Sequence, residues 1–144
     1  MENENLSPSQ VLGHVLAEIR QVCEDNVNGL DWTTSYFVLE SGVSFALPGE
    51  WGEGLCRESL PAGSVRLSGV DAVAGKRIAA LLRPQIGADI PNESLYLLFE
   101  DGYLVTDITG AYHGTSSTGI YIFPPGEIDM RQLVAVWGGT PPAC

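Results

Sequence analysis

Residues that can carry out nucleophilic catalysis occur close together in the second half of the chain. Asp107, His113 and either Ser116 or Ser117 could act as acid, base and nucleophile, and the His113–Gly119 loop could hold an anion. However, the chain has no Gly-x-Ser-x-Gly elbow, and Ser, Thr and Gly between two strands are ordinary turn residues. We therefore expect no catalytic residues, with a small hydrolase or ligand-binding protein that uses the His113–Gly119 loop as the alternative.

Phosphate-binding and metal-binding motifs lack their required spacing. The segment Gly69–Arg77 superficially resembles a phosphate-binding loop, but five residues separate its glycines and Arg77 follows the lysine where Ser or Thr is needed. The 2 histidines and 3 cysteines are scattered, without a His-x-x-x-His or Cys-x-x-Cys pair. We expect neither a metal nor a cofactor.

The charge of the chain is its most informative property. Asp and Glu number 18 against 7 Lys and Arg, which gives a net charge of −11. The segments 21–56 and 84–130 contain acids but no base, whereas 57–83 holds five of the bases. Such a field repels nucleic acids and anionic membranes and attracts basic proteins. We expect a basic protein partner, and no nucleic acid or membrane.

Aromatic residues flanked by acids are the candidate contact points. An exposed aromatic side chain can anchor an interface, while surrounding carboxylates set the rate and specificity of association. On this basis, the predicted partner-binding residues are Glu50, Trp51, Glu53, Glu100, Asp101, Tyr103 and Asp107.

The N-terminal part of the chain predicts a helix from Ser7 to about Asp25. Ser7, Pro8 and Gln10 are typical of a helix start, because Ser caps, Pro suits the first turn and Gln bonds back to the cap amide. Apolar residues then recur at helical spacing. They are Val11, Leu12, Val15, Leu16, Ile19, Val22 and Cys23.

The rest of the chain predicts strands. We expect them at 32–39, 43–47, 64–67, 76–82, 94–99, 103–108, 120–123 and 133–137, with the Asp-Gly hairpin of 94–108 at the centre of the sheet. The stretch 70–82 also fits a helical stripe, although Gly75 interrupts it, and we favour a turn followed by a strand. The expected fold is one α+β domain, 1–144, in which an N-terminal helix packs on a twisted, mainly antiparallel sheet of about six to eight strands. Residues 1–6 and 138–144 are expected to be loose tails.

The sequence shows neither a membrane span nor a secretory signal, which predicts a cytoplasmic protein. No apolar run approaches the length of about 20 residues that a membrane span needs. The start Met1-Glu2-Asn3-Glu4-Asn5 is acidic, unlike the basic start of a secretory signal.

A short acidic chain with acid-bearing loops such as Trp51-Gly52-Glu53-Gly54 and Phe99-Glu100-Asp101-Gly102-Tyr103 resembles the immunity proteins of bacterial toxin systems. These systems include contact-dependent growth inhibition, and the resemblance is one of type across the whole chain. It implies a protein that neutralises a cognate toxin, often a basic nuclease, by covering its active site or an adjacent surface. A non-catalytic subunit or adaptor is a further alternative, which charge alone does not separate from an inhibitor.

Overall fold

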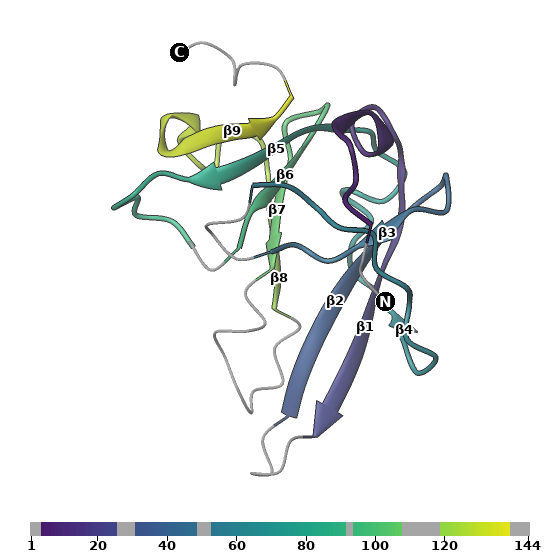
Figure 1. Cartoon of the computed structure of the whole chain (residues 1–144). Coiled ribbons are helices and arrows are strands. Elements are labelled where there is room, and N and C mark those ends of the chain that lie inside the picture. Colours follow the sequence, from purple (N-terminus) through teal and green to yellow (C-terminus); the bar gives the residue numbers. More distant parts are fainter. Residues whose placement is uncertain (1–3, 26–30, 49–52, 92–93, 108–118, 139–144) are drawn as a thin grey trace.

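The computed structural model describes residues 4–25, 31–48, 53–91, 94–107 and 119–138 (Figure 1). Within these ranges the chain is built from strands and contains no α-helix. The described 3-10 turns are η1 (Pro8–Gln10) and η3 (Met130–Gln132). The strands are β1 (Leu16–Asp25), β2 (Asp31–Leu39), β3 (Ser44–Phe45), β4 (Val65–Arg66), β5 (Ile78–Pro84), β6 (Tyr96–Phe99), β7 (Leu104–Asp107), β8 (Ile120–Phe123) and β9 (Leu133–Trp137).

These strands form two antiparallel sheets. The first has the order β3-β2-β1-β4, and its long strands β1 and β2 make a ribbon that extends away from the rest of the molecule (Figure 1). The second has the order β8-β7-β6-β5-β9. The hairpin predicted at 94–108 is confirmed as β6 and β7, and β6 lies at the centre of this second sheet.

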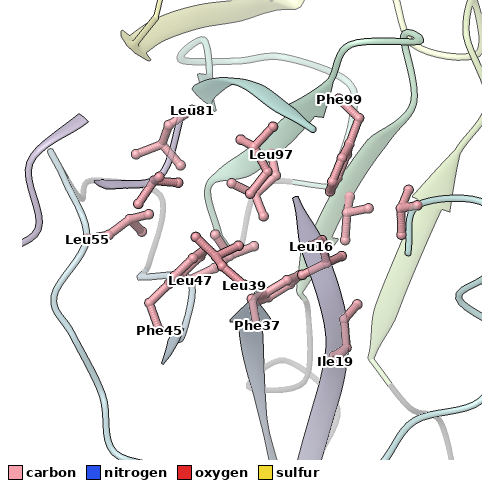
Figure 2. Packing of buried hydrophobic residues seen from close by; sticks show 14 of the residues in the cluster. Leu16, Ile19, Phe37, Leu39, Phe45, Leu47, Leu55, Leu81, Leu97 and Phe99 are labelled. Carbon is pink, nitrogen blue, oxygen red and sulfur yellow. The ribbon is translucent and has the colours of Figure 1, made fainter. Parts of the chain in front are cut away.

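The main hydrophobic core lies between the two sheets. Figure 2 shows Leu81, Leu97 and Phe99 of the second sheet packed together with side chains of the first. Phe37 and Phe45 stack with their ring centroids 5.7 Å apart. Both rings are fully buried, and burying such side chains stabilises a fold by about 1.5 to 3 kcal/mol each.

The opposite face of the second sheet carries a smaller apolar cluster. Side chains alternate between the two faces of a strand, so Ala80, Leu82 and Leu104 point away from the first sheet. Ile128 covers them, with Met130 packed alongside, and Leu133 of β9 belongs to the same cluster. The segment 124–132 therefore acts as a partial lid over this face.

The predicted N-terminal helix is wrong, and with it the α+β class. The start chemistry is correct in part, because the Ser7 amide donates to Gln10 Oε1 over 2.7 Å, but only the 3-10 turn η1 follows. Gly13 then takes a φ of +82° and donates its amide to the Ile78 carbonyl, which directs the chain into β1. The protein is an all-β, two-sheet structure across the residues described.

A β-bulge explains why this strand looks like a helix in the sequence. Leu16 pairs with Leu39 and Glu18 pairs with Val38, so Ala17 is an extra residue without its own partner. In a regular strand, residues three positions apart face opposite sides, but the extra residue reverses that alternation. Leu16 and Ile19 are consequently both buried, and their spacing imitates a helical stripe.

Most local strand predictions agree with the structure. A short strand at 65–66 lies within the predicted 64–67, the final strand at 133–137 occurs as expected, and the strand predicted at 76–82 is found at 78–84. The predicted tail 1–6 includes Leu6, which is buried and donates its amide to the Leu55 carbonyl.

The described part of the chain includes no helix long and apolar enough to cross a membrane.

Candidate protein-binding surface

The tip of the β6–β7 hairpin presents two acids in a tightly hydrogen-bonded turn. The Gly102 amide donates to the Phe99 carbonyl and the Phe99 amide donates to the Tyr103 carbonyl, each over 2.9 Å. Gly102 has a φ of +98°, a conformation that glycine adopts without the steric cost of a Cβ atom. The Glu100 amide donates to the Arg77 carbonyl, which fixes the tip against the segment before β5. The two acids therefore project from a well-defined backbone.

Asp101 is neutralised by a cation of the same chain. Its carboxylate accepts a hydrogen bond from Lys76 Nζ, and this ammonium also lies 5.8 Å from the centre of the Tyr103 ring. The hydrogen bond from Lys76 lowers the pKa of the Asp101 carboxyl below its ordinary value of 3.8. Asp101 is thus charged at neutral pH, but its charge is already partnered.

Glu100 has a different environment from its neighbour. It is exposed, and within the described residues it makes no ion pair. It borders a pocket of about 270 Å³ on the outer face of the second sheet. The pocket is walled by Leu98, Leu104, Pro125, Ile128 and Met130. An unpaired carboxylate beside an apolar hollow can hold a cation that carries an apolar stem.

The wall residues come from two separate parts of the sequence. Leu98 and Leu104 are opposite each other on β6 and β7, whereas Pro125, Ile128 and Met130 belong to the segment that covers the sheet. The sequence prediction missed this pocket. The one feature of the sequence that indicates the pocket is the strand alternation, which places Leu98 and Leu104 on the same face of the hairpin.

The other predicted contact residues do not gather with Glu100. Tyr103 packs its ring partly against the core between the sheets, and Asp107 is only 7% exposed at the end of β7. Glu53 is exposed at a different pocket, of about 410 Å³, which Trp137 also lines. Glu50 and Trp51 lie outside the described residues, as does the alternative catalytic loop except for Gly119.

Most of the basic residues are engaged within the protein. Arg57 pairs with Glu4, Arg20 and Arg66 pair with Glu18, Arg131 pairs with Asp129, and Lys76 pairs with Asp101. Arg77 donates to the Gly13 carbonyl over 2.8 Å. Three of the five bases in segment 57–83, Arg57, Arg66 and Lys76, therefore form ion pairs with acids of the same chain.

The two base-free segments come into contact in the fold. The Leu95 amide donates to the Pro48 carbonyl over 3.1 Å, which joins segment 84–130 to segment 21–56.

Among the residues that the structure describes, no three His, Cys, Asp or Glu side chains are grouped so that they could hold a metal ion.

Comparison of the chain with protein-family models, with curated proteins and with solved structures finds no match.

Proposed function

We propose that this protein is a non-enzymatic protein-binding module of the cytoplasm, an immunity-type inhibitor that holds a basic toxin domain against its acidic surface. The toxin is the kind of partner that the type-level resemblance to immunity proteins implies. The proposal assigns the β6–β7 tip and its neighbouring pocket as the centre of the contact.

The observation that carries the proposal is the internal pairing of the bases. Five of the seven Lys and Arg residues form ion pairs with acids of the same chain. The net charge of −11 therefore resides in carboxylates beyond those pairs, and Glu100 is one of them. A surplus of unpaired carboxylates steers a cationic protein toward the surface and raises its association rate.

The form of the surface supports the same proposal. Stable interfaces combine an apolar centre with a polar rim, and the residues that dominate the binding energy lie in the centre. Here the walls of the pocket supply an apolar centre, and Glu100 lies at its rim. The exposed Glu127 follows Gly126, which also lines the pocket.

Co-purification with the polypeptide encoded beside this chain's gene tests the proposal. We expect a stable complex, and we expect co-expression to relieve any growth defect that the partner causes. Glu100→Lys should slow association by about tenfold, because it reverses an unpaired charge at the rim of the proposed contact. Glu40→Lys, an equal charge change at the exposed β2–β3 turn, is the matched control and should slow association less.

Two results would contradict the proposal. The first is the absence of any complex with a basic polypeptide. The second is a complex whose association rate is unchanged by both substitutions.

A further inference from the structure

The pocket beside the β6–β7 tip combines features that select one kind of occupant. It has a volume of about 270 Å³, near the lower end of small-molecule pockets, which suits a single side chain. Its walls are aliphatic, and the exposed acidic residue Glu100 lines it. An occupant must therefore be apolar along its length and cationic at its end.

Glu100 is the acid of the β6–β7 tip that can pair with an incoming cation, because its neighbour Asp101 already has a partner. Asp101 is held by Lys76, so a cation that arrives at the pocket meets Glu100 first. Glu100 has no ion-pair partner within the described part of the chain, and all seven bases lie in that part. An incoming ammonium therefore displaces no existing ion pair at Glu100.

The lining of the pocket lacks one feature that favours arginine. Either cation can pair with a carboxylate, but a guanidinium gains further where it can stack on an exposed aromatic face. Phe99 borders the pocket, but the residue is only 1% exposed and its side chain packs in the core between the sheets (Figure 2). A lysine buries a stem of methylene groups along apolar surface and keeps its ammonium in water beside the carboxylate.

We propose that this pocket is an anchor site for a lysine side chain of the partner, with Leu98, Leu104, Ile128 and Met130 around the stem and Glu100 beside the ammonium. The proposal rests on the proposed function, since it names the anchor residue type within that contact. The stem and the ammonium contribute separately, and each can be removed without the other.

Three small probes with the same tail separate these contributions: n-pentylammonium, 1-pentanol and pentanoate. Each is titrated into the whole protein, and the methyl resonances of Ile128 and Met130 are followed by NMR. The exposed Ile86 serves as the reference methyl outside the pocket. We expect the affinity to fall in the order ammonium, alcohol, carboxylate. Glu100→Gln should weaken pentylammonium about two- to fivefold, as for an exposed ion pair, and leave pentanol unchanged.

Matched variants make each outcome decisive. Glu40→Gln removes the same charge at an exposed turn and should leave the affinity for pentylammonium unchanged. Met130→Gln should weaken all three probes, and its melting temperature confirms that the variant folds. The proposal is overturned if pentylammonium leaves the pocket methyls unshifted, if it binds no more tightly than pentanol, or if Glu40→Gln weakens it as much as Glu100→Gln.

The probes need no partner protein, which keeps the two proposals separable. If pentylammonium does not bind, the lysine anchor is refuted while partner binding still stands. If no basic partner binds, the proposed function is refuted even where the pocket accepts the probe.

Discussion

Two hairpin-turn glycines with nearly the same backbone conformation allow a steric contact to be measured on its own. Gly102 in the β6–β7 turn has a φ of +98°, and Gly42 in the β2–β3 turn has a φ of +96°. A Cβ atom added at Gly42 would meet nothing within 4 Å. At Gly102 it would lie 3.0 Å from Pro125 Cβ and 3.1 Å from Pro125 Cγ. Pro125 is a wall of the candidate pocket.

The two alanine substitutions should therefore differ by the cost of that contact. The left-handed backbone conformation costs an alanine about 1 to 2 kcal/mol, and this term is common to both. Overpacking adds about 1 kcal/mol at Gly102, the low end of its usual range, because Pro125 is exposed and can shift. We expect Gly42→Ala to lower the free energy of unfolding by about 1 to 2 kcal/mol, and Gly102→Ala by about 2 to 3 kcal/mol.

Urea unfolding and thermal melting of the three proteins provide the measurement. An additional 1 kcal/mol corresponds to a melting temperature about 3 to 5 °C lower for a domain of this size. Equal losses at the two glycines would refute the packing of the β6–β7 tip on Pro125. A larger loss at Gly42 would contradict the reasoning altogether.

Three further predictions address the fold and its electrostatics. Gly138→Ala should lower the free energy of unfolding by about 3 kcal/mol or more in the same urea assay. Gly138 has a φ of +97°, and an added Cβ atom would lie 2.8 Å from a backbone oxygen. A loss equal to that of Gly42→Ala would contradict this prediction. Ile19→Ala should lower the free energy of unfolding by about 2 to 5 kcal/mol, and Val22→Ala by about 1 kcal/mol. The strand places these two side chains on opposite faces, whereas a helix would place them on the same face. Equal losses would favour the helix. The lowered pKa of Asp101 means that its pair with Lys76 stabilises the fold fully above the ordinary value of 3.8 and loses this effect as the pH falls below it. The melting-temperature advantage over Asp101→Asn should be larger at pH 7 than at pH 3, and small at both, because the side chains are 33% and 43% exposed.

The parts of the fold that sequence reasoning predicted depend on local chemistry. The Asp-Gly turn between two apolar runs specifies the β6–β7 hairpin without reference to the rest of the molecule. The N-terminal helix failed because its evidence was a periodicity, and a single extra residue at Ala17 changes the periodicity of a strand. The division into two sheets was likewise not predictable, because it depends on contacts between segments far apart in the chain.

The sequence predicts the candidate site only as a group of acidic residues. The acids at Glu100 and Asp101 were recognised as a hairpin tip, but the sequence did not distinguish the free carboxylate from the paired one. That distinction depends on Lys76, which lies far from the tip in the chain and beside it in the fold. The apolar wall was missed for the same reason, since Leu98 and Met130 are brought together by the fold.

The salt dependence of the affinity for the basic partner tests the central claim most directly. The dissociation constant is measured by titration at rising NaCl concentrations, with the protein and the polypeptide encoded beside it. If unpaired carboxylates steer and hold the partner, the affinity should fall steeply as salt shortens the screening length from about 30 Å at low ionic strength to about 8 Å at physiological strength. An affinity that does not change with salt would contradict the claim that this acidic surface binds a basic protein.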